Sequence, residues 1–265
     1  MKTIAIAGLG SIGQAIAAGL AQGGANSMSG LALAAASARN EAQARERLDK
    51  LGLQRANLVP LHRIGDSADI VVECGGAEVL RRIAAPVLSS GKQLLVMSVG
   101  ALVAEPEMLE LAEQYHHRIH IPSGAIGGLD AVAAMAQGGI RSARLVTRKP
   151  PAALRDVAWL AGQGIDPGRI REPTLLFAGS ALEAVRRFPA NLNVAAALSL
   201  AGIGAQRTRV ELWLDPAARG NCHSIEVESD CATMRFSIEG QPSANPGTSS
   251  LAARSALALL QRLAA

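Results

Sequence analysis

The chain has 265 residues, enough for one large domain or two small ones. Aromatic residues make up only 2 % of it, which counts against the base-stacking surfaces of nucleic-acid-binding proteins. The net charge of +4 comes from 26 basic and 22 acidic residues that are interspersed, so we expect attraction for anionic small molecules and no nucleic-acid partner.

Two further features bear on the compartment. No apolar run has the length of a membrane span, and Met1 and Lys2 lead into a short strand-like run rather than a signal peptide. The cysteines are odd in number and have no C-x-x-C spacing, which favours packing roles over a disulfide framework or a zinc site: Cys74, Cys222 and Cys231. We therefore expect a cytoplasmic protein without membrane contact.

The first 124 residues alternate between strand-like and helix-like segments. Short apolar runs predict strands at 3–10, 30–38, 68–76, 92–100 and 118–124. Helices are predicted at 12–22, 40–51, 78–89, with Pro86 as a boundary or kink, and 105–116. This alternation predicts an α/β fold with a Rossmann-type, doubly wound parallel sheet.

The pattern changes in the second half of the chain. Strands with partial period-two alternation are predicted at 143–150, 208–215, 222–229 and 231–239, with helical runs at 151–161 and 192–201. Short connections between the last three strands predict a mostly antiparallel sheet with one face covered. We expect residues 1–124 with 247–265 to form a dinucleotide-binding domain, onto which the last helix packs, and residues 125–246 to form a substrate-binding α+β domain.

The first glycine-rich loop follows a strand and opens a helix. Gly8, Gly10 and Gly13 fit the pattern G-x-G-x-x-G, with Ser11 and Ile12 between the last two glycines. In this pattern the first glycine makes the turn, the second admits a pyrophosphate and the third allows close helix–strand packing. The free N–H groups at the helix start would bind the phosphates. The alternative is a glycine-rich turn without a ligand.

The end of the second predicted strand bears on the choice of cofactor. An acid at this place would bind the ribose 2′-hydroxyl of NAD, but the chain has Ser37 and Arg39 there. Both can bind a 2′-phosphate, so we expect NADP to be accepted, and the preference between NAD and NADP stays open. Alternatively, Arg39 only faces solvent.

A second glycine-rich stretch, IPSGAIGGLDAV, spans residues 121–132. Ligands of open α/β sheets bind at the carboxyl ends of the strands, where Gly75 and Gly76, Gly100, and Ser123 with Gly124 are expected. We predict that small residues in the second loop let the nicotinamide half of the cofactor lie against the backbone, beside the substrate.

Longer motifs in the second half are more distinctive than the glycine pattern. They are IPSGAIGGLDA (121–131), TRKP (147–150), FPANLNVAAALSLAG (188–202), NCHSIEVES (221–229) and NPGTSSLAARSALALL (245–260). In this combination the chain resembles the L-aspartate dehydrogenase family over nearly its whole length. The resemblance implies reversible oxidation of L-aspartate by NAD or NADP to iminoaspartate, which gives oxaloacetate and ammonia. It also implies a homodimer and, as in some members, a supply of iminoaspartate for NAD biosynthesis.

The resemblance also assigns residues. It implies that the backbone at Ala125 and the side chain of Asn191 contact the nicotinamide half of the cofactor, and that His223 is the active-site histidine. The chain departs from the family pattern at Ser37, where many members have an acid, and at Gly247, where many have a lysine.

The proposed chemistry requires a proton carrier and groups that bind carboxylates. Histidine suits the first need, because its pKa lies near the working pH. His223 is our candidate, against the alternative of a histidine without a catalytic role. Candidates for the substrate carboxylates are Ser123, Arg148, Lys149, Thr248 and Ser249, against the alternatives of surface charges and a helix N-cap.

Three histidines occur in HHRIH, at 116, 117 and 120. Their spacing would suit a metal only on a helix, and the segment runs into a strand, so we predict a solvated strand entry and no metal site. Two other functions remain open. One is a related two-domain dehydrogenase that acts on homoserine or a cyclic imine, and the other is a non-catalytic NADP-binding redox sensor.

Overall fold

The structure is a computed structural model that describes residues 1–22, 28, 30–66, 68–189, 191–242 and 249–264. The chain divides into two compact units. Unit 1 comprises Met1–Ser98, Glu105–Pro122 and Ala252–Ala265, and unit 2 comprises Val99–Ala104 and Ser123–Leu251. The sequence analysis placed the segment 99–104 in the first domain, whereas here it belongs to unit 2.

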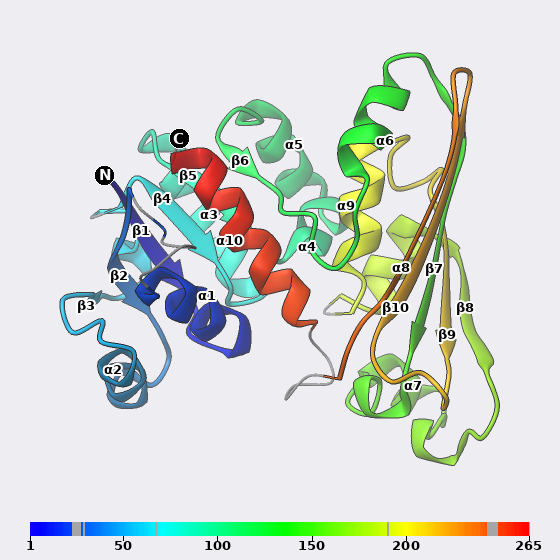
Figure 1. The fold of residues 1–265 in the computed structure, drawn as a ribbon, viewed down its shortest axis with the longest axis horizontal. Coiled ribbons are helices and arrows are strands. Elements are labelled where there is room, and N and C mark those ends of the chain that lie inside the picture. Colours follow the sequence, from blue (N-terminus) through cyan, green and yellow to red (C-terminus); the bar gives the residue numbers. More distant parts are fainter. Residues whose placement is uncertain (23–27, 29, 67, 190, 243–248, 265) are drawn as a thin grey trace. The chain divides into compact units, whose positions relative to one another are not determined.

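Unit 1 is built on a six-stranded sheet (Figure 1). Its strands are β1 (Lys2–Ala7), β2 (Leu31–Ser37), β3 (Asn57–Leu58), β4 (Ile70–Glu73), β5 (Gln93–Val96) and β6 (Ile119–His120). They are all parallel and lie in the order β3-β2-β1-β4-β5-β6. β1 and β4 are buried along their apolar residues because helices cover both faces of such a sheet. The predicted doubly wound parallel sheet is confirmed.

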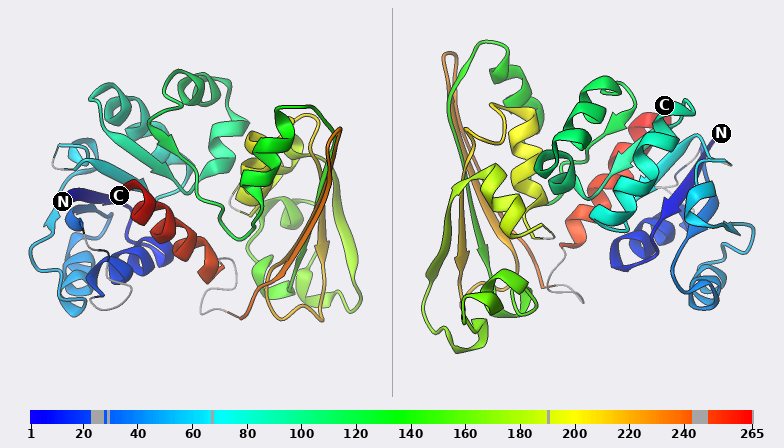
Figure 2. Two further views of the ribbon diagram at one scale, coloured as in Figure 1. Left: turned by 45° about the horizontal axis from the view of Figure 1, so that its top comes forward. Right: turned by 180° about the vertical axis from the view of Figure 1, so that it is seen from behind.

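The helices of unit 1 follow the strands in alternation. They are α1 (Ser11–Ala21), α2 (Glu41–Lys50), the short 3-10 helix η1 (Leu61–Arg63), α3 (Ala77–Ser89), α5 (Pro106–Gln114) and α10 (Ser250–Ala264). As predicted, α10 returns to the first unit: it buries Ala253, Ala256 and Leu260 in the same core as Ile4 and Ile16 (Figure 2). Pro86 lies inside α3 rather than at its end.

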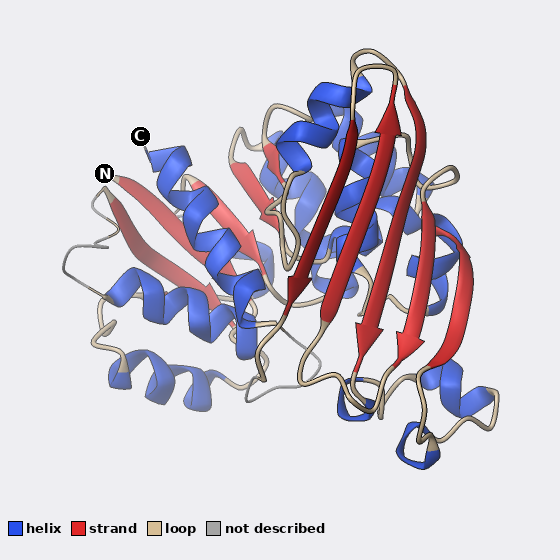
Figure 3. Ribbon diagram, turned by 45° about the vertical axis from the view of Figure 1, so that its right-hand side comes forward, coloured by secondary structure: helices blue, strands red, loops and turns tan. Residues whose placement is uncertain are grey.

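Unit 2 contains a five-stranded sheet (Figure 3). Its strands are β7 (Ile140–Lys149), β8 (Thr174–Ser180), β9 (Arg209–Leu214), β10 (Cys222–Ser229) and β11 (Thr233–Glu239), in the order β11-β10-β7-β9-β8. Three of its pairings are antiparallel, as predicted, but β7 lies between β9 and β10 and pairs with β9 in parallel. Strands that follow each other closely in the chain are therefore not all neighbours here.

Helices cover one face of this second sheet (Figure 3). The helices of unit 2 are α4 (Val99–Ala104), α6 (Leu129–Ala136), η2 (Pro151–Ala153), α7 (Ala158–Gly162), η3 (Pro167–Arg169), α8 (Ala181–Arg187) and α9 (Asn193–Ala201). Every second residue of β10, starting from His223, is buried, while residues between them are more exposed. The period-two pattern thus predicted the covered face correctly.

The segment after β5 corrects the sequence prediction. The run 92–100 was expected to be one strand, but β5 ends at Val96 and the buried helix α4 starts at Val99. Helix α4 packs on α8 and α9, and the backbone N–H of Gly100 donates to Asn193 Oδ1 at 2.9 Å. Periodicity could not separate strand from helix in this run, because a continuously apolar segment is typical of either when it is fully buried.

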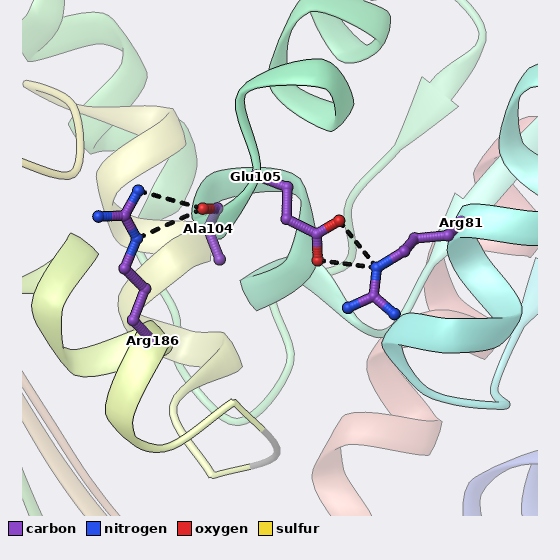
Figure 4. Close-up of polar contacts among 4 residues, drawn as sticks. All are labelled: Arg81, Ala104, Glu105 and Arg186. Carbon is purple, nitrogen blue, oxygen red and sulfur yellow. Dashed lines mark hydrogen bonds and ion pairs between the residues drawn. The ribbon is translucent and has the colours of Figure 1, made fainter.

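The chain returns from unit 2 to unit 1 between Ala104 and Glu105 (Figure 4). Two nitrogens of Arg186 donate to the carbonyl of Ala104, each at 3.4 Å. Arg81 Nε donates to both carboxylate oxygens of Glu105, at 2.8 and 2.9 Å. Each of these neighbouring residues is therefore held by an arginine of its own unit.

Candidate active site

A pocket of about 650 Å³ lies in unit 1 at the carboxyl ends of β1, β2 and β4. Each strand contributes the residues that follow it. The lining includes Gly8, Leu9 and Gly10 after β1, Ser37, Ala38 and Arg39 at the end of β2, and Cys74 and Gly75 after β4. This is the place at which open parallel sheets bind their ligands.

The glycines of the first loop are required by close packing. A Cβ atom on Gly8, whose φ is +107°, would lie 2.8 Å from the Gly75 backbone, and one on Gly13 would lie 2.0 Å from the Gly8 carbonyl oxygen. A Cβ atom on Gly10 would meet nothing within 4 Å, so the space beside this residue is open. No side chain caps α1 and no acid occupies its first turn, so its N-terminal N–H groups are available to an anion. These features fit a pyrophosphate.

Charged side chains also line the pocket. Ser37 and Arg39 are among the lining residues, and the sequence analysis did not name four other charged ones: Glu41, Arg47, Glu78 and Arg82. Glu41 and Arg47 belong to α2, and Glu78 and Arg82 belong to α3. These are the helices that follow β2 and β4, so residues on their first turns were candidates for the lining. Ser11, Ile12, Gly13 and Gly76 adjoin the lining but are not part of it.

The second glycine loop has a packing role that the sequence analysis did not foresee. A Cβ atom on Gly127 would lie 3.0 Å from the ring of Phe236, and one on Gly128, whose φ is +75°, would lie 3.0 Å from Met234 Sδ. Side chains from β11 therefore require the small residues at 127 and 128. Ala125 is 8 % exposed and belongs to the same core.

Four polar residues of unit 2 come together on the covered face of its sheet. Thr147 and Lys149 are two residues apart on β7, so their side chains point to the same face, and His223 pairs with Thr147 across β10. Thr147 Oγ1 and His223 Nδ1 share a hydrogen bond of 3.1 Å. Lys149 Nζ donates to Asn191 Oδ1 at 3.3 Å. Three of the four were predicted site residues, and Thr147 was missed, although its register opposite His223 follows from the strand pairing.

Burial sets the charge states in this cluster. Lys149 is 2 % exposed and His223 4 % exposed. Burial lowers the pKa of Lys149 to about 8. Burial, and then the charge of Lys149, lowers the pKa of His223 to about 3. Over the described ranges no carboxylate forms an ion pair with Lys149. The cluster thus has a buried amine with no acidic partner beside a neutral imidazole.

Two other predicted substrate residues, Arg148 and Ser249, make their contacts outside this cluster. Arg148 points to the opposite face of the sheet, where it lies 3.7 Å from Asp215 and stacks on Trp213. The hydroxyl of Ser249 accepts the backbone N–H of Leu251 at the start of α10, as an N-cap does. Ser123 lies at the start of the main segment of unit 2. Thr248 and Gly247 lie outside the described residues.

His116 and His117 lie in a turn and His120 ends β6. Within the part of the chain that the structure describes, no three His, Cys, Asp or Glu side chains are grouped as metal ligands. The three cysteines are all free. No helix in the described ranges has the length and apolar character needed to cross a membrane.

Comparison with known protein families finds two matches, which meet near the junction of the two units at Pro122 and Ser123, although the second match extends into the part of α10 that belongs to unit 1. Residues 8–122 match the family "Homoserine dehydrogenase, NAD binding domain", and residues 130–263 match "Aspartate dehydrogenase, C-terminal". The second match covers half of the chain and includes the buried cluster. The chain belongs to the L-aspartate dehydrogenase family.

Individual relatives agree with this assignment. The chain is 46 % identical to L-aspartate dehydrogenase 3 of Bordetella bronchiseptica, across 99 % of this chain and 95 % of that one. It is also 46 % identical to L-aspartate dehydrogenase of Bradyrhizobium diazoefficiens, across 98 % and 90 %. Among solved structures, aspartate dehydrogenase from Thermotoga maritima is similar with a TM-score of 0.71 and 25 % identity, across 99 % and 97 % of the two chains.

Proposed function

We propose that this protein catalyses the reversible oxidation of L-aspartate by NAD or NADP to iminoaspartate, which water converts to oxaloacetate and ammonia. Family membership supports the reaction, and the pair of buried residues Lys149 and His223, with the half-buried Asn191 bonded to Lys149, is the observation that carries it. A purely structural core has no use for an amine and an imidazole that are buried without an acidic partner.

The pocket of unit 1 is the proposed cofactor site. Gly8, Gly10 and the start of α1 would hold the pyrophosphate, with Ser11, Ile12 and Gly13 supplying backbone N–H groups or close packing. Ser37 and Arg39 would hold the adenosine ribose or its 2′-phosphate, and Gly75 and Gly76 would border the site. Ala125 and Asn191 are proposed contacts of the nicotinamide half. The cofactor supplies the hydride acceptor.

Lys149 is the proposed partner of a substrate carboxylate. L-aspartate carries two carboxylates, and an ammonium group that is buried without an acid gains most when such an anion arrives. Binding the anion would also raise the pKa of Lys149 from about 8, which keeps the amine charged. Lys149 was one of five candidates for this role in the sequence analysis, and the geometry favours it over Arg148, which lies on the other face.

His223 is the proposed proton carrier. The substrate amine must lose a proton before hydride leaves, and water must lose one when it attacks the imine. Burial and the charge of Lys149 lower the pKa of His223 to about 3, which keeps the imidazole neutral but makes it a weaker base than the sequence analysis expected. A bound substrate carboxylate would raise this pKa, and in the tautomer whose Nδ1–H donates to Thr147, Nε2 can accept a proton. The Thr147 hydroxyl can donate to Nδ1 or accept from it, and so it accommodates both tautomers of the ring.

The competing functions are less well supported. A homoserine dehydrogenase shares the match at residues 8–122, but the match at 130–263 is to the aspartate family. A redox sensor that binds NADP without catalysis would not need the buried Lys149 and His223. By resemblance we also propose a homodimer, a cytoplasmic location and a supply of iminoaspartate for NAD biosynthesis.

One experiment tests the reaction directly. Purified protein is mixed with NAD or NADP and a panel of L-aspartate, L-asparagine, L-alanine and L-homoserine, and the reduced nicotinamide is followed by absorbance. We expect reduction with L-aspartate, and the reverse reaction with oxaloacetate and ammonia. Reduction with homoserine alone, or with none of the panel despite cofactor binding, would contradict the proposal.

A further inference from the structure

The carboxylate of Glu73 accepts four hydrogen bonds next to the lining of the pocket. Glu73 ends β4, is 0 % exposed, and lies directly before the lining residues Cys74 and Gly75. Its Oε1 accepts the backbone N–H groups of Gly75 and Gly76, both at 2.8 Å. Neither the sequence motifs nor the proposed chemistry gave this residue a role.

The same carboxylate reaches the end of the next strand. Ser98 lies two residues beyond β5, and its backbone N–H donates to Glu73 Oε2 at 2.9 Å. The Ser98 hydroxyl donates to Oε1 at 3.0 Å. One side chain therefore joins the turn after β4 to the turn after β5 by four hydrogen bonds.

The surroundings fit the ionised form of this side chain. Backbone N–H groups can only donate, and such groups face both carboxylate oxygens, so a proton on either oxygen would oppose a donor. Burial raises the pKa of Glu73, and the donors at Ser98, Gly76 and Gly75 act against it. No arginine or lysine in the described ranges forms an ion pair with it. A buried anion held only by neutral donors is costly to keep, which argues for a specific role.

The turn that Glu73 holds is packed against the phosphate loop. The backbones of Gly75 and Gly8 are so close that a Cβ atom on Gly8 would lie 2.8 Å from Gly75. Gly76 precedes the first residue of α3, whose Glu78, Val79 and Arg82 also line the pocket. A shift of this turn would thus move both the Gly75 backbone that contacts Gly8 and the start of α3.

We infer that Glu73 is a positioning residue for the cofactor: its carboxylate fixes the Gly75–Gly76 turn to Ser98 and so sets the shape of the dinucleotide pocket. The inference rests on the assignment of this pocket to the cofactor under Proposed function. It adds a residue that touches neither cofactor nor substrate and acts through backbone N–H groups.

The substitution Glu73→Gln tests this role. Glutamine has the same shape, but its NH₂ group must face either the Ser98 N–H or the two glycine N–H groups, so one contact becomes a donor–donor conflict. We expect the Kd of NAD and NADP, measured by calorimetry on the full chain, to rise about tenfold. The KM for L-aspartate at saturating cofactor should change less than about twofold, because unit 2 is untouched. A merely structural residue would lower the melting temperature and leave the cofactor Kd of the folded protein unchanged.

Glu78→Gln is the matched control for charge. Glu78 is an exposed carboxylate of the same pocket and makes none of these backbone contacts. Removing its charge should leave the cofactor Kd equal or lower, since the cofactor is anionic. Opposite signs for the two variants support positioning, and a lower Kd in both would show that Glu73 acts only as a charge and would overturn the inference.

Ser98→Ala keeps the test valid if Glu73→Gln fails to fold. It removes one of the four hydrogen bonds and keeps the backbone N–H, so we expect the cofactor Kd to rise about threefold. An unchanged Kd in both folded variants, or in Ser98→Ala when it alone folds, would overturn the inference and leave the proposed function intact. A wild-type protein that binds neither NAD nor NADP would instead overturn the pocket assignment and both proposals.

Discussion

Thr147 Oγ1 lies 3.1 Å from Nδ1 of His223, and both side chains are buried on the covered face of the second sheet. Because this contact occupies Nδ1, the other ring nitrogen is the one left for chemistry. The hydroxyl can donate or accept, so it holds the ring in place without fixing the proton on one nitrogen. Thr147 therefore acts through His223, and this makes its role testable separately from a general effect on folding.

The first prediction concerns this contact. Thr147→Val keeps the shape of the side chain and removes the hydroxyl, which leaves the buried Nδ1 without its partner. We expect kcat to fall about tenfold, the cost of one unsatisfied buried group, and the pH profile of kcat to shift. Thr147→Ser should retain activity and the wild-type pH profile. An unchanged pH profile in the valine variant would show that Thr147 contributes packing only and does not act on His223.

The second prediction concerns Lys149 and substrate charge. Lys149→Met removes the amine and fits the apolar surroundings. We expect the KM for L-aspartate to rise at least about tenfold, because a charged hydrogen bond to a carboxylate is lost. Discrimination between aspartate and alanine should fall with it. Arg148→Met is the control on the opposite face, and an equal loss of discrimination in that variant would contradict the assignment.

The third prediction follows from the lowered pKa of Lys149. The native amine titrates at about pH 8, whereas the unfolded amine titrates near 10.5. Between these values the unfolded chain binds more protons, so the contribution of Lys149 to stability improves as the pH rises through this window. The free energy of unfolding, measured with denaturant, should therefore increase from pH 8 to pH 10 in the wild type relative to Lys149→Met. If the difference in free energy of unfolding between the two proteins is the same at both pH values, the lowered pKa of Lys149 is contradicted.

The fourth prediction concerns the cofactor. NADP should be used at least as efficiently as NAD, because Ser37 and Arg39 line the pocket where an acid would exclude a 2′-phosphate. Ser37→Asp should shift kcat/KM toward NAD, and Arg39→Ala should raise the KM for NADP only. Glu41→Gln is the control for a change of charge near Arg39, since Glu41 is an acid in the first turn of α2. A strong preference of the wild type for NAD, together with an unchanged KM for NADP in Arg39→Ala, would refute the prediction that these two residues favour NADP.

The sequence predicted the parallel sheet and the phosphate loop because their patterns are local. Strand, glycine turn and helix follow each other within about twenty residues, and β1, α1, β2, α2, β4 and α3 lie where the sequence patterns predicted them, whereas the short β3 and η1 were not predicted. It also predicted Lys149, Asn191 and His223 as site residues, the last two through the family motif. Their convergence on one face followed only from the structure.

What could not be predicted depends on contacts between distant segments. Gly127 and Gly128 were interpreted through the cofactor, but the side chains that demand them belong to β11, more than 100 residues later. Helix α4 was taken for the end of a strand, because its burial by α8 and α9 removes the polar residues that would show a helical period. Glu73 and Thr147 carry no motif, and their importance lies in partners that strand pairing brings to them, Ser98 and His223.

The last prediction concerns His223 itself. If its Nε2 accepts the proton of the substrate amine or of the attacking water, removing the ring should cost about 10²–10⁴ in kcat, the usual effect of a positioned acid–base group. His223→Ala should keep its affinity for NADP, because the phosphate loop belongs to unit 1 and is untouched. His223→Asn should not recover activity, since an amide cannot exchange the proton. Stopped-flow reduction with saturating cofactor and aspartate measures the loss, and calorimetry with NADP measures the retained affinity. Near-normal kcat in either variant would refute the role of His223, whereas joint loss of kcat and NADP binding would indicate damage to the fold rather than to proton transfer.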